Sequence, residues 1–576
     1  MVGGHHFAKR WGAEPLGDGR WRFSLWAPDA HELAVEIDGA ATPMIKAADG
    51  WFTAEARAQS GQSYAFRIDG ALYPDPAARA QAGDVHGPSL LVDPSAYRWT
   101  HKWAGIPWHQ AVIYEPHVGT FTAQGTLEAA RMELARLKAL GVTLIELMPL
   151  AQFEGQRGWG YDGVLLYAPH NAYGSPDDLK HFVDTAHGLG LGVILDVVYN
   201  HFGPSGNYLA AWCPSFFHGA RASAWGEGIA YEQQAVRSFL RDNALYWLEE
   251  YQLDGLRLDA VHAMGDASSP HILDDIAQAV RARDWGRHVH LITEDERNLA
   301  GYFRNDAPFD ATWNDDWHHA LHCLLTGEHE SYYAPFAVDP LGDIETALRD
   351  GYVEQGQSRP QSEAPRGESS ADLPRTAFIN FLGNHDQVGN RAQGERLHHL
   401  VQDEDALRVV TALTLLTPFT PMLFMGDEFL TPAPFLFFTD FTGDLAEAVR
   451  TGRAREFERF SAFTGAVPDP NAPETAARSR IGHATTDAQL RHEAYVRDLL
   501  ALRAEHVQPR LARNARPSVT IEREGARFEA CWLFIPGRLL LNVSLGDGSV
   551  QPLLDPFFVE AREGSRFALT AAVRTD

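Results

Sequence analysis

Positive charge is scarce in this sequence, and its scarcity restricts the expected partners. The 576 residues carry a formal net charge of −27, whereas a protein that binds nucleic acid presents a basic face to it. An anionic membrane surface would repel such a chain for the same reason. We therefore expect neither nucleic acid nor a membrane as partner, and a neutral ligand suits this charge better.

Cysteine is also rare, and long apolar runs are few. Cys213, Cys323 and Cys531 are far apart, so neither a disulfide framework nor a metal-ligand spacing is visible. Residues 1–11 lack the apolar core of a signal peptide, and these features together are typical of a cytoplasmic protein. The apolar run at 409–425 contains two prolines, which favours a buried helix followed by a buried strand over a membrane span.

Three regions of different periodicity make up the chain. Residues 1–105 combine alternating apolar residues with frequent Asp-Gly turns, which predicts an N-terminal, immunoglobulin-like β-sandwich. Residues 106–507 repeat strand and helix patterns about eight times, which predicts an α/β fold with a closed (β/α)8 TIM barrel and inserted loops. The sixth barrel strand, near 309–313, has the weakest pattern. Residues 508–576 return to short strands and predict a C-terminal β-sandwich.

Two polar segments interrupt the barrel pattern, at 354–374 and at 467–488. Both contain several prolines and polar residues, and neither shows the apolar periodicity of a helix or a strand. We therefore interpret both as mobile surface loops.

The segment Gly255-Leu-Arg-Leu-Asp259 is the most informative strand pattern in the chain. Its alternation places Leu256 and Leu258 on one face, and Arg257 and Asp259 on the other. The guanidinium is expected to lower the pKa of Asp259 and keep its carboxylate ionised, as covalent glycosyl transfer requires. The alternative interpretation is an ion pair that only stabilises a core.

Acidic side chains recur at the ends of other predicted strands. In a (β/α)8 barrel the carboxyl ends of the strands form one mouth, where catalytic residues lie. The acids and histidines expected at this mouth are Asp196, His201, Asp259, Glu294, His385 and Asp386. Because glycoside cleavage needs a proton donor and an opposed carboxylate, we predict a site at which Asp259, Glu294 and Asp386 converge.

Two metal-binding hypotheses compete with this prediction. One set of side chains could bind a divalent ion, namely Asp196, His201, His385 and Asp386. That set is disfavoured because Arg257 would place one cation against another. His318 and His322 stand four residues apart on a predicted helix, but the glutamate of the zinc-protease helix is missing. Packing of that helix face near the site is therefore predicted.

Four of these stretches, taken in order, resemble the four motifs of the α-amylase family, glycoside hydrolase family 13. They are residues 196–201, residues 255–259, Glu294 after its strand, and residues 384–386. The resemblance covers about 110–505, and the flanking β regions resemble that family's accessory domains, with a carbohydrate-binding-module-like sandwich at the N-terminus. It implies a retaining enzyme with Asp259 as nucleophile, Glu294 as general acid/base and Asp386 as a third acid that binds sugar hydroxyls.

The resemblance also implies a set of substrate-binding residues. They are Tyr161, Asp196, His201, Arg257, His262 and His385. Arg257 would orient Asp259, and Tyr161 would stack on the sugar ring bound at subsite −1. His262 would contact the sugar on the leaving-group side, and the other two histidines would hydrogen-bond the sugar at −1. Neither a cofactor nor a metal ion is implied.

Three further stretches narrow the resemblance within the family. Residues 313–322, 383–391 and 425–429 are similar to members that release trehalose from maltooligosyltrehalose, and the last two stretches also resemble glycogen branching enzymes. The likeness implies hydrolysis of the α-1,4-glucosidic bond next to the terminal trehalose unit, after a maltooligosyltrehalose synthase has acted. A branching or debranching enzyme of the same family and a non-catalytic glycan-binding protein are the alternatives.

Two details of the mouth follow from the same stretches. Glu296 is the alternative general acid, because residues 293–297 hold three acids in succession. We also expect walls around the leaving-group side, built from His262, residues 313–322, Asp427, Glu428 and an aromatic residue such as Trp225 or Tyr332.

Overall fold

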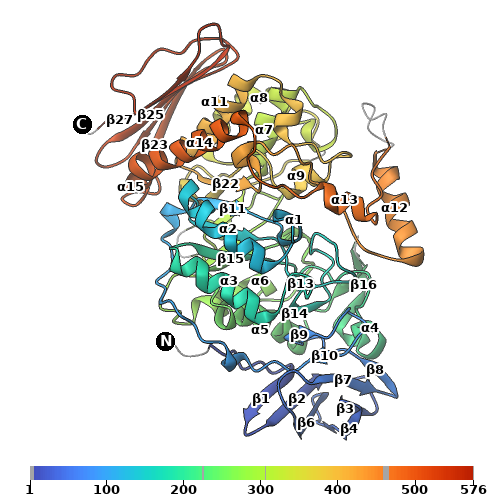
Figure 1. Ribbon diagram of the computed structural model, residues 1–576. Helices are drawn as coiled ribbons and strands as arrows, with labels where there is room; N and C mark the ends of the chain where they lie inside the picture. The colour runs from blue at the N-terminus through green and yellow to red at the C-terminus, as the bar shows by residue number, and fades with distance from the viewer. Residues whose placement is uncertain (1–4, 224–225, 305–306, 363, 458–465, 575–576) are drawn as a thin grey trace.

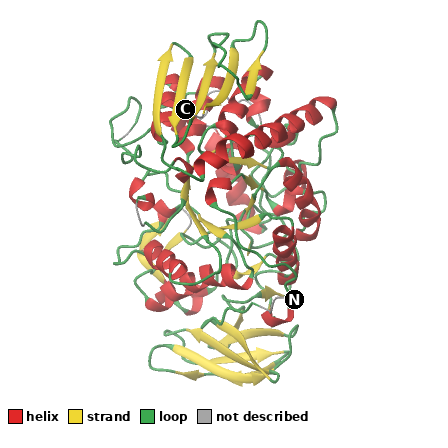
Figure 2. Cartoon of the chain, turned by 90° about the vertical axis from the view of Figure 1, so that its left-hand side faces the viewer, coloured by secondary structure: helices red, strands yellow, loops and turns green. Residues whose placement is uncertain are grey.

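The structure is a computed structural model that describes residues 5–223, 226–304, 307–362, 364–457 and 466–574. Three sheet-containing parts follow one another along the length of the molecule (Figures 1 and 2). The N-terminal sheets form one end, the barrel with its helices occupies the middle, and the C-terminal sheet forms the other end.

The N-terminal part consists of two antiparallel sheets that face each other, in agreement with the predicted sandwich. Phe23 of one sheet contacts Tyr64 of the other, with 5.5 Å between ring centroids. Both residues of the turns Asp38-Gly39 and Asp69-Gly70 have positive φ angles, the conformation that Asp-Gly favours in tight hairpins. The sheets comprise β1 (Gly12–Gly17), β2 (Arg20–Trp26), β6 (Trp51–Arg57) and β5 (Ile45–Lys46), and β4 (Ala40–Pro43), β3 (Leu33–Ile37), β7 (Ser63–Ile68), β8 (Ala71–Tyr73), β10 (Ser89–Leu90) and β9 (Ala80–Gln81).

Eight parallel strands close into a barrel, which confirms the predicted (β/α)8 fold. In barrel order they are β11 (Ile113–Glu115), β12 (Leu144–Leu147), β15 (Gly192–Val197), β18 (Gly255–Leu258), β19 (His290–Thr293), β20 (Ala311–Trp313), β21 (Phe378–Asn380) and β22 (Thr420–Phe424). The weakly predicted sixth strand is β20, which pairs Ala311 with Ile292 of β19 and Trp313 with Ile379 of β21.

Helices cover the barrel, and local signals set their ends. Thr126 caps the first long helix by accepting the N–H of Ala129, and Gly141, with φ of 110°, ends it. The principal helices are α2 (Leu127–Leu140), α3 (Pro176–Gly188), α5 (Gln234–Glu250), α6 (Ile272–Arg281), α7 (Asp315–Thr326), α8 (Pro340–Asp350), α11 (Glu404–Leu416) and α14 (Asp487–Leu502). The apolar run at 409–425 forms the second half of α11 and all of β22, as a buried helix followed by a buried strand. No helix of the described residues combines the length and the apolarity needed to cross a bilayer.

The C-terminal part differs from the predicted sandwich. Its described residues form one five-stranded antiparallel sheet, in the order β23-β24-β25-β27-β26. Phe567 packs against Val401, Ala406 and Leu407, so helical residues at the start of α11 cover this sheet where a second sheet was expected. The strands are β23 (Ser518–Glu524), β24 (Arg527–Leu533), β25 (Arg538–Leu545), β26 (Phe558–Ala561) and β27 (Phe567–Arg574).

The two polar segments pack more closely than the prediction of surface loops implied. Asp316, at the start of α7, accepts the backbone N–H groups of Val353 and Glu354, at 2.7 and 2.9 Å. Arg366 forms an ion pair with the buried Glu354. The second segment contains α13 (Pro473–Arg478). The first segment lacks apolar periodicity because buried carboxylates and backbone groups hold it in place, and no apolar face is needed.

One ion pair fastens the N-terminal sheets to the barrel. Arg79 and Glu250, the last residue of α5, are 2% and 1% exposed, and the guanidinium Nε and Nη2 donate to both carboxylate oxygens at 2.9–3.2 Å. Arg79 also contacts Glu14 of β1 at 2.8 Å. The pair therefore joins the two parts through a desolvated, bidentate contact.

Candidate active site

The predicted acids lie where the barrel strands end. Asp196 is the fifth residue of β15, Asp259 follows β18 directly, and Glu294 follows β19 directly. Asp386 lies in α9 (His385–Gly389), which begins five residues after β21 ends at Asn380 and has Asn384 as its cap. Parallel strands place these residues at the same end of the barrel, which is the end where TIM-barrel sites occur.

Arg257 is the centre of the site. Its guanidinium lies 2.6 Å from Asp196 Oδ2, 2.9 Å from Asp259 Oδ1 and 2.8 Å from Glu294 Oε2. The residue is completely buried, and its guanidinium carbon lies 3.8 Å from the centre of the Trp313 ring. The indole N–H of Trp313 donates in turn to Glu146 at 3.1 Å. One rigid cation, supported by an aromatic face, therefore fixes three carboxylates.

The direction of the Asp259 pKa shift differs from the prediction. The Arg257 charge acts to lower the pKa of Asp259, but burial outweighs it and raises that pKa above its ordinary value. Burial likewise raises the pKa of Asp196, of Glu294 and of Asp386. Arg257 faces three carboxylates with a single charge, so full ionisation of the group is costly. A proton held on one carboxyl group is what a general acid requires.

Two contacts that the sequence did not reveal orient the catalytic pair. The Asn200 amide donates to Asp259 Oδ2 and to the Asp259 backbone oxygen, each at 2.8 Å. Ala260 has a φ of 40°, a left-handed conformation that is unfavourable for alanine. In this conformation its backbone N–H donates to Glu294 Oε2 at 2.8 Å. The strained residue therefore links the strand end of Asp259 to the second carboxylate.

His385 is held by an acid that was also missed. Its Nδ1 lies 2.5 Å from Glu115 Oε1 at the end of β11, and its Nε2 lies 3.4 Å from Asp386 Oδ2. Burial alone would lower the pKa of His385, but the two neighbouring carboxylates raise it to about 9. The Tyr161 ring stacks on the imidazole at 5.0 Å. His385 is thus a cation at neutral pH, set between Glu115 and the third acid.

Tyr161 and His201 complete this side of the site. The Tyr161 hydroxyl donates to Asp196 Oδ2 at 2.6 Å, and His201 Nε2–H donates to the Tyr161 backbone oxygen at 3.0 Å. Burial lowers the pKa of His201 to about 4, so its imidazole is neutral. These contacts bring Tyr161, Asp196 and His201 to the cluster around Arg257.

The structure separates the two candidate general acids. The Glu294 side chain is 18% exposed and contacts Arg257, whereas that of Glu296 is 65% exposed and lies 3.7 Å from His262 Nε2. Only Glu294 belongs to the carboxylate cluster. His262 is 26% exposed at the rim, where it can reach a ligand.

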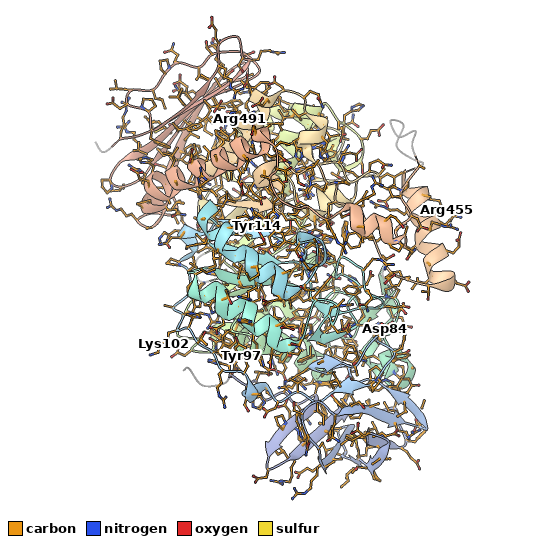
Figure 3. The ribbon with its side chains drawn as sticks, in the orientation of Figure 1. Asp84, Tyr97, Lys102, Tyr114, Arg455 and Arg491 are labelled. Atoms are coloured by element: carbon orange, nitrogen blue, oxygen red, sulfur yellow. The ribbon has the colours of Figure 1, made fainter. Side chains whose placement is uncertain are left out.

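Several residues expected in the leaving-group wall lie elsewhere. Glu428 is fully buried and accepts a hydrogen bond from the hydroxyl of Tyr114. Figure 3 shows Tyr114 beside α2. Asp427 pairs with Arg396 at 2.9 Å. Trp313 lies beneath Arg257. Glu428, Asp427 and Trp313 each contact a buried partner, and they therefore stabilise the interior of the protein. Tyr332 is 48% exposed, and Trp225 lies outside the described residues.

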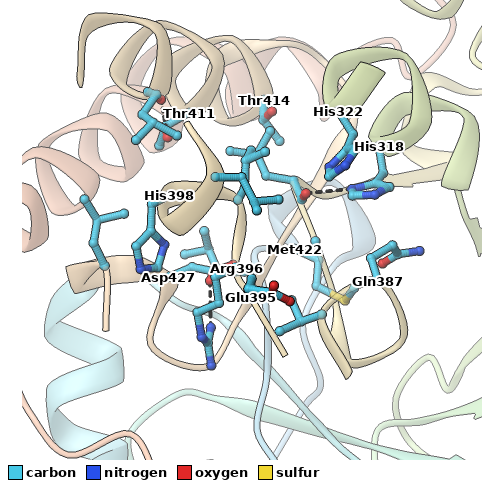
Figure 4. Close-up of a pocket in the computed structure, with 18 of the residues that line it drawn as sticks. His318, His322, Gln387, Glu395, Arg396, His398, Thr411, Thr414, Met422 and Asp427 are labelled. Carbon is cyan, nitrogen blue, oxygen red and sulfur yellow. Dashed lines mark hydrogen bonds and ion pairs between the residues drawn. The ribbon is translucent and has the colours of Figure 1, made fainter. Parts of the chain in front are cut away.

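A cavity of about 60 Å³ lies among α7, α9, α11 and α14, and none of the three candidate carboxylates lines it (Figure 4). His318 and His322 face this cavity. His318 hydrogen-bonds the Leu382 oxygen at 2.7 Å and the Tyr333 hydroxyl at 2.9 Å, and burial lowers the pKa of both histidines. The helix face therefore packs inside the protein beside α9, as predicted. The four-residue metal set of the sequence is not among the potential cation clusters of the described chain.

The barrel and its acids at the strand ends define a glycoside hydrolase of the α-amylase family. The sequence model of that family, "Alpha amylase, catalytic domain", matches residues 73–213. A crystal structure described as a putative alpha amylase from Salmonella typhimurium is 45% identical, with a TM-score of 0.95 over 99% of this chain and 100% of that one. A pullulanase from Anoxybacillus sp., solved with maltotetraose, is 18% identical with a TM-score of 0.71 over 99% and 88% of the two chains, and so shares the fold.

Curated relatives identify the branch of this family. The malto-oligosyltrehalose trehalohydrolase of Deinococcus radiodurans is 43% identical over 97% of this chain and 93% of its own length. The enzyme of the same name from Saccharolobus solfataricus is 38% identical over 92% and 91%. The chain belongs to the malto-oligosyltrehalose trehalohydrolase family. A 1,4-alpha-glucan branching enzyme from Rhodospirillum rubrum is 33% identical, but over only 44% of this chain.

Proposed function

We propose that this protein hydrolyses the α-1,4-glucosidic bond next to the terminal trehalose unit of maltooligosyltrehalose, releasing trehalose and a maltooligosaccharide. The observation that carries the chemistry is the single guanidinium that binds Asp259 and Glu294 together at the strand ends. The full-length likeness to relatives named for this activity supports the substrate.

The geometry supports a double displacement. The Glu294 carboxylic acid gives its proton to the glycosidic oxygen while an Asp259 carboxylate oxygen bonds to the anomeric carbon, and trehalose departs with that proton. The Glu294 carboxylate then takes a proton from water, whose oxygen displaces Asp259 and frees the maltooligosaccharide. Asp386, next to the cationic His385, binds sugar hydroxyls during both steps. The released chain therefore first appears as the α-anomer, and a β-anomer in early NMR spectra would contradict this mechanism.

A branching or debranching enzyme could use the same three acids. Branching would transfer the glycosyl chain from Asp259 to a glucan hydroxyl instead of water, so it is distinguished by products rather than by catalytic residues. The partial match of the branching enzyme makes this the second candidate. A non-catalytic glycan-binding protein would lack at least one acid, whereas Asp259, Glu294 and Asp386 are all present.

The decisive experiment compares maltooligosyltrehalose, a maltooligosaccharide of equal length and amylose at equal concentration. We expect cleavage next to trehalose to exceed cleavage of the maltooligosaccharide by at least about a hundredfold, which is roughly 2.7 kcal/mol of differential transition-state binding. The Asp259→Asn variant, which lacks the nucleophile, is the inactive control. Comparable rates on the two oligosaccharides, or new α-1,6 branches in amylose, would reject the proposed substrate.

The preceding enzyme and the other ligands of the site follow from the proposed substrate. A synthase that makes the 1,1-linked end must act first, and related α-1,4-glucans are the other ligands that fit a neutral sugar site. We also place the protein in the cytoplasm, because the chain has only three cysteines, which stand far apart in the sequence and fit a reducing compartment.

A further inference from the structure

A second cluster of potential ligands lies at the opposite end of the barrel from the carboxylates. His288, His290 and Asp310 each offer one ligand atom, and these atoms lie within 4.8 Å of one another. His290 is the first residue of β19, whereas Glu294 follows the end of that strand. Four residues of extended chain separate them by about 13 Å, so this cluster takes no part in the glycosidic chemistry.

The imidazole of His290 is set up as a metal ligand. Its Nε2 lies 2.9 Å from the backbone oxygen of Ile106, and a carbonyl only accepts, so Nε2 carries the hydrogen. Nδ1 therefore keeps its lone pair, and it is buried without any hydrogen-bond partner. A histidine that donates one ring N–H to a backbone carbonyl and offers the other nitrogen is the usual arrangement around a bound metal.

The other two ligands lie beside it, with His288 at the surface and Asp310 half-buried. The His288 side chain is 54% exposed, and its Nε2 lies 2.7 Å from Asp310 Oδ1. Asp310 Oδ2 is already occupied by Arg281, at 2.7 Å, and by the Leu291 N–H, at 2.8 Å. These bonds fix the carboxylate and leave Oδ1 turned to His288. A cation can thus enter from solvent and replace the proton shared by His288 and Asp310.

We propose that His288, His290 and Asp310 bind one divalent transition-metal ion, of the Zn²⁺ or Co²⁺ type, at the amino-terminal end of β19 and β20. Two imidazoles and one carboxylate suit these ions, whereas Mg²⁺ and Ca²⁺ prefer all-oxygen sets. Water completes the coordination. The ion clamps the approaches to two neighbouring barrel strands, so it acts on stability and not on the reaction. Binding to the folded chain alone raises thermal stability by mass action.

A rival location exists in the described chain. Asp84, His86 and Glu154 form a similar cluster, and Figure 3 shows Asp84 where the N-terminal sheets meet the barrel. There the His86 Nδ1 is occupied by the Tyr208 hydroxyl at 2.6 Å, and its Nε2 is 3.8 Å from Glu154. This cluster therefore lacks an unpaired buried nitrogen, and it supplies the matched control.

The test titrates the untagged, metal-free full chain with Co²⁺ and follows the ligand-field absorption band, with Zn²⁺ melting curves as a second readout. We expect one ion per chain and a higher melting temperature with Zn²⁺. His288→Gln, at an exposed position, should weaken binding by at least about tenfold and remove the melting shift, while His86→Gln should change neither. Absence of stoichiometric binding, unchanged binding in His288→Gln, or loss of binding in His86→Gln would each overturn the proposal.

Discussion

At the scale of single residues, Glu294 and Asp259 contact the same guanidinium but carry different tasks. Glu294→Gln removes the proton donor, so hydrolysis of substrates with poor leaving groups should fall by about 10²–10⁴-fold. For glycosyl substrates whose leaving group needs no protonation, the rate of the first step, glycosyl transfer to Asp259, should stay nearly unchanged. Asp259→Asn removes the nucleophile and should abolish turnover of both kinds of substrate. The rate of leaving-group release in the first turnover, measured on the two substrate classes, gives the difference.

Glu296→Gln is the control for this series, because Glu296 is two residues away and largely exposed. It should keep nearly full activity on both substrate classes. If Glu296→Gln shows the leaving-group pattern and Glu294→Gln does not, the general acid has been misassigned.

The position of His385 between Asp386 and Glu115 makes stability depend on pH. These two carboxylates raise the pKa of His385 from 6.5 to about 9 in the folded protein, so their contribution to stability is fully present below pH 6.5 and is lost as pH rises through about 9. The loss amounts to about 3 kcal/mol at most. Glu115→Gln removes one of the anions that raise this pKa, so the variant should lose less stability over the same pH range. Urea unfolding midpoints at a series of pH values test this, and parallel profiles would contradict it.

The catalytic candidates and the partner Arg257 could be predicted from sequence, but the partners that come from distant strands could not. Asp259 and Glu294 stand directly after strand patterns, and one barrel rule brings such positions together. Glu115 and Trp313 approach the site from strands far along the chain, and only the closed barrel shows that they touch His385 and Arg257. The pKa of Asp259 was predicted in the wrong direction because burial depends on the whole surroundings.

At the scale of secondary structure, one buried carboxylate holds a long connection. Asp316 accepts two backbone N–H groups from residues 353–354 and is 1% exposed. Asp316→Ala should therefore free this segment, because hydrogen bonds to a buried charge contribute about 1.5–3 kcal/mol each. Hydrogen exchange of residues 353–362 should accelerate by at least about tenfold.

Glu368→Gln provides the comparison, because Glu368 is 43% exposed and holds the same connection through the Gly301 N–H. Its exchange rates should stay close to those of the unchanged protein. Slow exchange at 353–362 in Asp316→Ala would show that other contacts secure the segment.

Elements with strong local patterns were predicted well, and those set by long-range contacts were not. The ends of α2 are marked locally in the sequence, because Thr126 caps its start and Gly141 ends it. The C-terminal part is one sheet and not a sandwich, because α11 covers one face of that sheet. The pattern of a strand does not show whether a helix or a second sheet will cover it. The segment at 354–374 looked mobile because its anchor, Asp316, lies outside it.

At the scale of the whole molecule, Arg79 and Glu250 couple the N-terminal sheets to the barrel. Glu250→Gln keeps the shape but removes a buried charge, and breaking such a pair costs about 3 kcal/mol. We expect a lower urea midpoint and faster proteolysis in the connection at residues 94–108. Glu249→Gln is the matched control, because its partner Arg283 is at the surface and such pairs contribute at most about 1 kcal/mol. Equal midpoints for the two variants would argue against this role of the pair.

The imbalance of charge around Arg257 has a consequence for inhibitors and modified substrates. Asp196, Asp259, Glu294 and Asp386 outnumber the cations Arg257 and His385, so the mouth attracts positive charge. A sugar-shaped ring with a protonated nitrogen at the reacting position should be bound far more tightly than its uncharged counterpart. A glucan that carries phosphate or uronate groups beside the scissile bond should be rejected, because each added negative charge would be desolvated among carboxylates. The same acids that cut the chain should thus exclude substrates that carry negatively charged groups beside the scissile bond.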